Sequence, residues 1–333
     1  MSIITDAGTR RQRCRGKERM FLVCGEALWD LFANEDGPAL TFDARVGGSP
    51  FNVATGLSRL GQDTAFLSGL STDPLGTRLI AALEREQVDT GYLTLFRCPT
   101  TLSLVDLAAN GSPAYTFYGT GAADRALSRE NLPALDDSVW GIHFGSYSLV
   151  VEPVGSAFLT LAQREAGRRL ITLDPNVRLN VESDRELWRQ RIDAFARHAD
   201  VVKVSEEDLE LLYPGECPAG IAARWRAAGV GLVIVTCGRA GVQAFGCGVM
   251  VEVEARRVQV VDTVGAGDSF QAALIACLAE CGMTTRAALD EIDSDRLANI
   301  ICFAVEAAAV TCTRRGADLP HRAELAECCK ENS

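Results

Sequence analysis

A glycine-rich turn followed by a carboxylate stands in residues 261–270, VDTVGAGDSF. Apolar residues then recur at helical spacing, which predicts a helix that begins in or just after GAGD. These apolar residues are Phe270, Leu274, Cys277, Leu278 and Cys281. The first backbone amides of a helix lack internal partners and carry the positive end of the macrodipole, and glycines let a ligand approach them. The sequence therefore predicts an anion site, suited to phosphate, at Gly265, Ala266 and Gly267.

Asp268 admits two interpretations on the motif alone. A carboxylate at the start of a helix can serve as its cap. If phosphate occupies the glycine turn, the same carboxylate lies beside it with a lone pair free to take the proton of an attacking hydroxyl. That is the positioned base of phosphoryl transfer, a reaction in which alignment and charge stabilisation supply most of the catalysis.

A second glycine motif lies near the start of the chain, in RVGGSPFNVATGLSRLG at 45–61. Its pattern predicts a helix with Ser49 as N-cap, Pro50 at the first helical position and Gly61 as the stop. Asn52 falls in the first turn, where its amide can point toward whatever the paired glycines approach. As structure alone, the motif is a well-capped helix.

Other phosphate-binding and dinucleotide-binding patterns are missing from the sequence. There is no GxxxxGK[ST], since the single Gly-Lys pair stands in RGKE near the N-terminus, and no GxGxxG follows a strand and opens a helix. A kinase with this sequence needs a fold other than that of the P-loop enzymes, and a nicotinamide oxidoreductase is disfavoured.

Strand-like and helix-like segments alternate from Phe21 onward, which predicts an α/β fold of three layers, with a mostly parallel central sheet between helices. The expected strands lie at 20–25, 64–70, 141–150, 169–174, 201–205 and 231–238, and the expected helices at 74–87, 154–167, 186–199 and 220–229. We expect a disordered extension at 1–20, one domain at 21–320 and a C-terminal tail at 321–333.

One region breaks the alternation. Residues 92–120 contain consecutive strand patterns around an Asn110-Gly111 turn, which predicts a β-hairpin. Such a hairpin, with the strand pattern of 39–46 beside it, can form a small sheet over a site; we expect this lid from about 31–46 and 92–122. The alternative is an extra edge pair on the main sheet.

Composition excludes several classes of protein. A net charge of -11 over 333 residues argues against sequence-independent nucleic-acid binding. No run approaches the roughly 18 apolar residues of a membrane span, and the basic N-terminus is not a secretory signal. The 12 cysteines are scattered without a CxxC pair, and the three histidines lack metal-ligand spacing. Buried, reduced thiols in a cytoplasmic protein are expected.

Together the two glycine motifs resemble the signature motifs of the PfkB, or ribokinase-like, family of carbohydrate kinases, and the likeness extends from Phe21 to about Leu319. The resemblance implies a central sheet flanked by helices and a small β lid over a sugar. It implies that Asp268 is the base and that the glycine turn is the anion hole for the transferring phosphoryl group. By the same resemblance the sugar hydroxyls are held by Asp30, Gly47, Gly48 and Asn52.

The segments between and after the motifs extend the resemblance to ATP and cations. Ser205 and Asp208 stand where relatives carry Asn-x-x-Glu, tied to Mg²⁺ and phosphate through water, which implies nucleotide binding for Ser205 and Mg²⁺ for Asp208, although an acidic helix start looks the same. A strand and turn that contact the nucleotide correspond to Thr236, Gly238 and Gly241, although an ordinary tight turn looks the same. A K⁺ site is implied near Asp262 and Val264, beside residues 310–317.

Residues 115–127 and 144–178 are similar to bacterial fructokinases. Arg178 in DPNVR is a cation expected near phosphates or a substrate oxygen, or else paired with the acidic residues of NVESDRE. Tyr118, Asp124 and Arg125 are expected lid contacts to the sugar, or else an aromatic packed in the small sheet and a solvated ion pair.

The resemblance therefore implies an ATP-dependent sugar kinase, most similar to a fructokinase, that phosphorylates a primary hydroxyl with Asp268 as base. The competing substrates are 2-keto-3-deoxygluconate, ribose or a nucleoside, and the competing class is a non-catalytic sugar sensor. The expected partners are the sugar and ATP with Mg²⁺, and a homodimer through the lid sheets is allowed.

Overall fold

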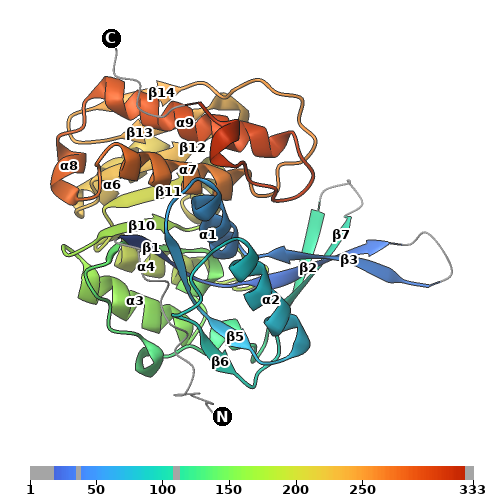
Figure 1. Ribbon diagram of the computed structural model, residues 1–333. Helices are drawn as coiled ribbons and strands as arrows, with labels where there is room; N and C mark the ends of the chain where they lie inside the picture. Colours follow the sequence, from blue (N-terminus) through green and yellow to red (C-terminus); the bar gives the residue numbers. More distant parts are fainter. Residues whose placement is uncertain (1–18, 35–38, 108–112, 327–333) are drawn as a thin grey trace.

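The computed structural model describes residues 19–34, 39–107 and 113–326. Its main feature is an eight-stranded sheet in the order β14-β13-β12-β11-β10-β9-β1-β4 (Figure 1). The strands are β1 Met20–Cys24, β4 Thr64–Leu67, β9 Val139–Gly145, β10 Leu170–Asp174, β11 Val201–Ser205, β12 Leu232–Thr236, β13 Val242–Phe245 and β14 Met250–Val253. From β4 to β12 neighbours run parallel, and β13 and β14 add antiparallel strands at one edge. The mostly parallel sheet is confirmed; β13 and β14 were missed by the sequence reasoning.

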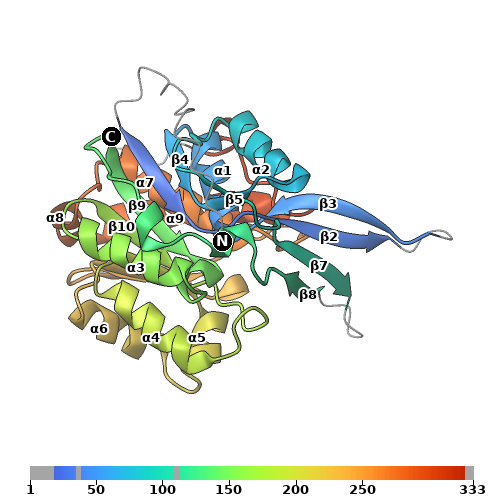
Figure 2. The same ribbon diagram turned by 90° about the horizontal axis from the view of Figure 1, so that it is seen from below.

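Helices cover both faces of this sheet, as predicted (Figure 2). One layer contains α1 Ser49–Arg59, α2 Pro74–Arg85, α7 Ala266–Glu280, α8 Arg286–Asp290 and α9 Ser294–Cys312. The other contains α3 Val154–Glu165, α4 Arg185–Ala196, α5 Glu206–Leu212 and α6 Pro218–Ala227. Short 3₁₀ turns occur at η1 Ala123–Arg125, η2 Arg129–Asn131, η3 Ser146–Leu149, η4 Gly238–Ala240 and η5 Arg322–Glu324.

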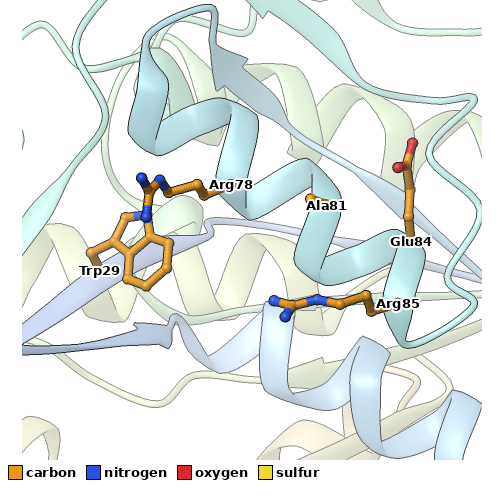
Figure 3. A pocket seen from close by; sticks show the side chains of 5 residues that line it. All are labelled: Trp29, Arg78, Ala81, Glu84 and Arg85. Atoms are coloured by element: carbon orange, nitrogen blue, oxygen red, sulfur yellow. The ribbon is translucent and has the colours of Figure 1, made fainter.

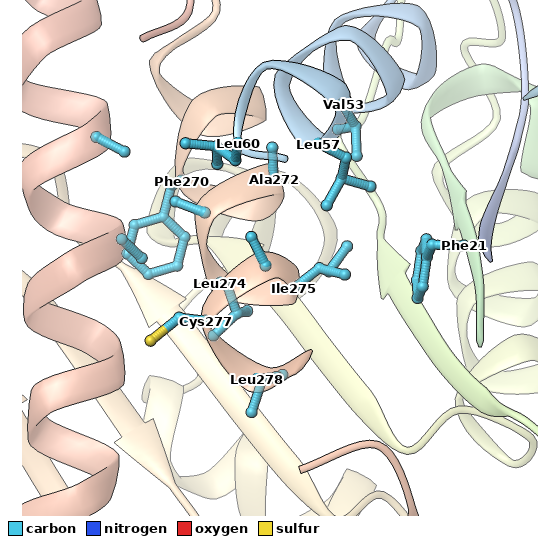
Figure 4. Close-up of a cluster of buried hydrophobic side chains, with 14 of the residues drawn as sticks. Phe21, Val53, Leu57, Leu60, Phe270, Ala272, Leu274, Ile275, Cys277 and Leu278 are labelled. Atoms are coloured by element: carbon cyan, nitrogen blue, oxygen red, sulfur yellow. The ribbon is translucent and has the colours of Figure 1, made fainter. Parts of the chain in front are cut away.

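The helix that follows the glycine turn is the centre of the first layer. Side chains of α7 are buried around most of its circumference, which is the pattern of a helix packed on all sides. It packs against α1 and α9, and its Leu274 and Ile275 belong to the same cluster of buried side chains as Val53 and Leu57 of α1 (Figure 4). This packing fixes the start of α7 against the start of α1.

A separate four-stranded sheet projects from the body (Figures 1 and 2). We call it the lid sheet; its order is β3-β2-β7-β8, with β2 Leu28–Asn34, β3 Thr41–Gly47, β7 Leu102–Leu107 and β8 Pro113–Tyr118. The predicted hairpin is therefore β7-β8, and it belongs to a sheet of its own rather than to the edge of the central sheet. The Asn110-Gly111 turn lies outside the described residues.

Two details of the lid differ from the expectation. The segment 39–46 was expected beside the hairpin, but the strand that pairs with β7 is β2, and β3 lies beyond it. The segment Leu28–Asn34, which forms β2, was not recognised as a strand. Residues Thr94–Phe96 form β6, which pairs with β5 Gly69–Ser71 in a two-stranded sheet instead of joining the lid. The expected extension, except for its last two residues, and most of the expected tail lie outside the described ranges.

The cysteines are less uniformly buried than expected. Cys24 and Cys277 are buried, whereas Cys217, Cys247 and Cys302 are exposed. Burial in apolar surroundings raises the pKa of the Cys24 thiol well above its usual value, which keeps it protonated. Within the described ranges, no helix combines the length and apolar character needed to cross a bilayer.

Candidate active site

The two glycine motifs meet at Asp268. The Ser49 hydroxyl donates a hydrogen bond of 2.6 Å to Asp268 Oδ1, and Asn52 Nδ2 donates one of 2.8 Å to Asp268 Oδ2. The donors precede the acceptor by more than 200 residues, so the contact depends on the packing of α1 against α7. The side chain of Asp268 is 7% exposed. Both carboxylate oxygens are therefore fixed in direction, and each still has a lone pair for a further donor.

The structure corrects the expected caps. The N-cap of α7 is Gly265, at a left-handed φ of 78°, and Asp268 is the third residue of the helix and caps nothing. The N-cap of α1 is Gly48, at φ 103°, rather than Ser49. The prediction of Gly61 as a stop agrees with its φ of 84° just after Leu60, the C-cap. The side chains of Ser49 and Asp268 are thus free to bond to each other.

The glycine turn is sterically closed on two sides. A Cβ on Gly265 would lie 2.6 Å from the Cβ of Ala317, and a Cβ on Gly267 would lie 3.2 Å from Lys203 Nζ. The Ala266 amide donates a hydrogen bond of 3.2 Å to the Thr263 carbonyl. The amides at the start of a helix have no acceptor inside it, which suits the turn to an anion, and the anion site there stays a prediction.

Asp30 faces the same region from the lid sheet. It lies in register with Arg45 of β3 and Ser103 of β7, so these three side chains share one face of the sheet. Burial raises the pKa of the Asp30 carboxyl, and the negative charge of Asp268 adds to this, while the Arg178 cation lowers it. The charges of Asp268 and Arg178 therefore both act on Asp30.

Gly47 and Gly48 are required by close approach. A Cβ on Gly47 would lie 2.1 Å from Asp30 Oδ2, and one on Gly48 would lie 2.6 Å from the Glu26 carbonyl. The paired glycines thus let α1 begin directly beside the Asp30 carboxylate. This places the carboxylate close to the helix start that holds Asp268.

Two aromatic residues of β8 were missed by the sequence reasoning, and Tyr118 was chosen in their place. Phe117 pairs with Ser103, and Tyr115 lies on the same face, stacked with Phe117 at 6.5 Å. Burial and the charge of Asp30 raise the pKa of Tyr115. Tyr118 belongs to the opposite face and is 61% exposed. The period of two along the strand was a usable signal, but it does not say which face turns inward.

Asp124 and Arg125 lie at the base of the lid sheet, away from solvent. The Thr101 hydroxyl donates a hydrogen bond of 2.5 Å to Asp124 Oδ1, and the Tyr147 hydroxyl donates one of 2.9 Å to Asp124 Oδ2. The Arg125 guanidinium lies 5.2 Å from the centre of the Tyr147 ring. The pair is therefore not a solvated one, and the Asp124 carboxylate joins Thr101, the residue before β7, to Tyr147 of η3.

Arg178 has no ion pair with the acidic residues that follow it in NVESDRE. Its guanidinium donates to the carbonyls of Asn176 and Val177, and it lowers the pKa of Asp30 and of Asp208. Asn176 is left-handed, at φ 40°, in the turn after β10. The structure thus supports the interpretation of Arg178 as a cation of the site.

Asp208 and Ser205 are joined to each other and to the same turn. Ser205 is the N-cap of α5 and accepts the Asp208 amide at 3.0 Å, and Asp208 Oδ1 accepts the Val177 amide at 3.0 Å. Burial raises the pKa of Asp208, against the Ser205 hydrogen bond and the cations Arg178 and Lys203. The described ranges contain no group of three or more His, Cys, Asp or Glu residues arranged to hold a metal.

The expected nucleotide residues gather at the carboxyl end of the central sheet. Thr236 ends β12 and is in register with Ser205, which ends β11. Gly238 and Gly241 both have positive φ in the turn that follows, and a Cβ on Gly241 would lie 2.2 Å from the Val253 carbonyl. Ligands of open α/β sheets bind at this edge of the sheet.

The expected cation loop is brought together by Asp262. Its Oδ1 accepts the Val264 amide at 3.1 Å, and its Oδ2 accepts the Gly316 amide at 2.8 Å. The carboxylate therefore fastens residues 261–264 to 312–316, and the backbone carbonyls of this junction remain the groups suited to a monovalent cation.

Two cations beside the site were missed. Arg45 of the lid sheet reaches the loop near the glycine turn, since a Cβ on Gly316 would lie 3.0 Å from its Nη1. Lys203 of β11 lies beneath Gly267. A signal existed for Lys203, because a charged residue interrupts the valine-rich strand VVKVS.

A hollow of about 580 Å³ lies elsewhere, between Trp29 and helix α2 (Figure 3). It is lined by Trp29, Arg78, Ala81, Glu84 and Arg85. Trp29 points to the face of the lid sheet opposite to Asp30, so this hollow is not part of the site built around Asp268.

Known proteins share this architecture. The family model for pfkB family carbohydrate kinases matches residues 18–323. A fructokinase of Rhizobium leguminosarum bv. trifolii is 37% identical over 281 residues, covering 84% of this chain and 86% of that protein. The structure of fructokinase with bound ATP from Xylella fastidiosa has a TM-score of 0.82 at 26% identity, covering 92% of this chain and 97% of that one.

A second similar solved structure contains fructose. The fructokinase of Vibrio cholerae O395 in a fructose, ADP and calcium ion bound form has a TM-score of 0.76 at 25% identity, over 91% of this chain and 95% of that one. The family model, the sequence relative and both structures cover nearly all of the described fold. The chain therefore belongs to the pfkB family of carbohydrate kinases, and it is a phosphotransferase with an alcohol group as acceptor.

Proposed function

We propose that this chain is an ATP-dependent fructokinase that transfers the γ-phosphoryl group to a primary hydroxyl of fructose. The observation that carries the proposal is the carboxylate of Asp268, which Ser49 and Asn52 hold beside the glycine turn. The choice of fructose is supported by the likeness to fructokinases in sequence and in structure.

In the proposed reaction Asp268 accepts the proton of the sugar hydroxyl as the hydroxyl oxygen attacks the γ-phosphorus of ATP, and the bond from that phosphorus to the bridging oxygen breaks, so that ADP leaves. A carboxylate whose two oxygens are already oriented loses little freedom when it receives that proton. The amides of the turn formed by Gly265, Ala266 and Gly267 stabilise the charge on the transferring phosphoryl oxygens. Alignment and charge stabilisation are the two contributions that phosphoryl transfer demands.

The sugar lies, in this proposal, between the inner face of the lid sheet and the start of α1. Asp30 and the backbone of Gly47 and Gly48 hold its hydroxyls, and Asn52 divides its hydrogen bonds between Asp268 and the sugar. A site built to hydrogen-bond hydroxyls penalises substrates that lack them. Tyr115 and Phe117 replace Tyr118 as the aromatic contacts, and Asp124 and Arg125 hold the lid in place instead of touching sugar.

ATP lies along the carboxyl end of the sheet, against Ser205, Thr236, Gly238 and Gly241, with its phosphates directed toward Arg178 and the glycine turn. The buried carboxylate of Asp208 fits Mg²⁺, which keeps several waters and borrows phosphate oxygens. When bound, Mg²⁺ neutralises charge on the phosphates. K⁺ would be held by carbonyls at the junction that Asp262 fastens near Val264, and a homodimer would use the outer face of the lid sheet.

A sugar panel tests this proposal. We expect ATP and Mg²⁺ to support phosphorylation of fructose with a kcat/KM at least about tenfold above that for ribose, 2-keto-3-deoxygluconate or a nucleoside. Asp268→Asn keeps one of the two acceptor oxygens but cannot take the proton, so we expect turnover to fall by a factor on the order of 10³ with sugar binding retained. Near-normal kcat in Asp268→Asn would overturn the role of the base, and equal rates on all sugars would overturn the choice of fructose.

A further inference from the structure

A buried lysine lies directly behind the glycine turn. Lys203 is in the middle of β11, flanked in the central sheet by β10 and β12, and is 4% exposed. The strand is otherwise apolar up to Ser205, and strands of a parallel sheet covered on both faces are normally apolar throughout. Burying an ammonium group costs free energy, so its presence here calls for a partner and a reason.

The partner of Lys203 is Asp174, at the carboxyl end of β10. Lys203 Nζ donates a hydrogen bond of 2.8 Å to Asp174 Oδ2, and both side chains are almost wholly buried. Asp174 Oδ1 has no hydrogen-bond partner in the described part of the chain. The pair is thus held in place but incompletely satisfied at the edge where ligands of such sheets bind.

The lysine also abuts the anion hole. A Cβ on Gly267 would lie 3.2 Å from Lys203 Nζ, so the ammonium lies against the backbone of the second glycine in the turn. One helical turn further along α7, Gln271 Nε2 lies 3.4 Å from His143 Nδ1, and this ring nitrogen is 2.9 Å from the Thr172 hydroxyl. The start of α7 therefore lies over polar side chains of the sheet, those of His143, Thr172 and Lys203, whereas the rest of the helix lies over apolar ones.

We propose that Lys203 is a positioning residue for the phosphoryl transfer: fixed by Asp174, its ammonium supports the Gly265–Gly267 turn from behind and adds positive charge to the anion hole. The inference rests on the proposed kinase reaction. Preorganised positive charge in a site of low dielectric stabilises a developing anion far more than the same charge does in water. Stability alone does not require the pair, since apolar replacements of buried ion pairs are often neutral or stabilising.

The test compares Lys203→Met, which removes the cation alone, with Lys203→Met/Asp174→Asn, which removes both charges and leaves no buried carboxylate unpaired. We expect kcat for fructose to fall by about 100-fold in both variants, with the KM for fructose changed less than about threefold. We expect the single variant to lose thermal stability and the double variant to recover most of it. Recovery of kcat to within about threefold of wild type in the double variant would show that the pair is only structural.

A binding measurement separates this inference from the choice of sugar. By calorimetry with Mg²⁺ and no sugar, we expect the ratio of the Kd for ADP to the Kd for ATP to fall at least about fivefold in both variants, because Lys203 acts on the γ-phosphate end. An unchanged ratio would overturn the inference even if fructose is the substrate, and a changed ratio would support it even if fructose is not.

A matched control removes a buried cation just before the start of β10, the strand that ends at Asp174. Arg169 precedes β10 and pairs with Glu165 at 2.8 Å, with both side chains about 5% exposed or less. We expect Arg169→Met to lower the midpoint of thermal unfolding while kcat of the folded enzyme and the nucleotide ratio stay within about twofold of wild type. Loss of kcat in this control equal to that in Lys203→Met would contradict the positioning role.

Discussion

Asp268 is positioned by two donors that the sequence did not connect to it. Ser49 was expected to cap a helix and Asn52 to hold the sugar, yet both donate to the Asp268 carboxylate. A carboxylate held through both oxygens presents its remaining lone pairs in fixed directions. In the proposed reaction α1 therefore has a share in orienting the base besides its share in binding the sugar.

Ser49→Ala tests that share. The variant removes one of the two hydrogen bonds that orient the base, so we expect kcat to fall about tenfold while the KM for fructose changes less than about threefold. We expect stability to fall by about 1 to 3 kcal/mol, because a hydrogen bond to a buried charged group is lost. Steady-state kinetics and urea unfolding measure both effects.

Ser58→Ala is the control for this prediction. Ser58 lies in the same helix, and its hydroxyl donates 2.5 Å to the Glu86 carbonyl, at the far end of α1 from Asp268. We expect a similar loss of stability with kcat unchanged. Wild-type kcat in Ser49→Ala would show that Asn52 alone is sufficient to orient the base.

At the scale of elements, the junction of β3 with α1 sets the distance between the sugar site and the base. Gly47 ends the strand and Gly48 caps the helix, with the Asp30 carboxylate packed against the first of them. Because Gly47 does not have a positive φ, what requires glycine there is the space taken by Asp30 rather than the backbone conformation.

Gly47→Ala should therefore act on substrate binding through Asp30. Its Cβ would lie 2.1 Å from Asp30 Oδ2, so the carboxylate must move, and we expect the KM for fructose to rise at least about tenfold. Gly61→Ala is the control, since its Cβ meets nothing within 4 Å but its φ is positive. We expect it to cost about 1 kcal/mol of stability and to leave KM unchanged; an unchanged KM in Gly47→Ala would contradict the role of Asp30.

At the scale of the whole molecule, buried carboxyls hold the lid sheet to the body. Glu26 lies between β1 of the body and β2 of the lid and accepts a hydrogen bond of 2.5 Å from the Ser148 hydroxyl of η3. Asp124 of η1, which follows β8, accepts hydrogen bonds from Thr101, just before β7, and from Tyr147 of η3. Burial raises the pKa of Glu26 to about 7, against the Ser148 hydrogen bond and with help from the charge of Asp124.

The pKa of Glu26 gives stability a pH dependence. Between about pH 4.5 and 7 the native carboxyl keeps a proton that the unfolded chain releases, so its contribution to stability is greatest below pH 4.5 and is lost as pH rises through 7. Glu26→Gln removes this ionisation and keeps an oxygen for Ser148. We therefore expect the free energy of unfolding of the variant, relative to that of wild type, to increase from pH 5 to pH 8 by up to about 3 kcal/mol.

Urea unfolding at the two pH values measures this gain. The pKa values of Asp124 and of Asp174 are also raised, mainly by burial. The charge of Asp124 acts on Glu26, so the difference between the two proteins reports Glu26 together with this coupling. An equal difference in stability at pH 5 and pH 8 would contradict the buried, protonated state of Glu26.

The sequence by itself determined the α/β layers, the hairpin and, to within a residue, the two helix starts at Gly48 and Gly265. These follow from hydrophobic periodicity and turn chemistry, which are local properties of the chain. The resemblance carried by the two motifs added Asp268 as the base and the glycine turn as the anion hole. Local patterns were sufficient for these predictions because each concerns residues close together in sequence.

Only the tertiary structure decided which side chains face one another. Ser49 and Asp268 are 219 positions apart, and Lys203 reaches Gly267 from a strand of the central sheet, so no local pattern connects them. The period of two along β8 separates Tyr118 from Tyr115 and Phe117, but which set faces Asp30 depends on how the lid sheet pairs and turns toward the body. The packing of α1 against α7 and the register of the two sheets are cooperative properties of the whole fold, and they complete the site.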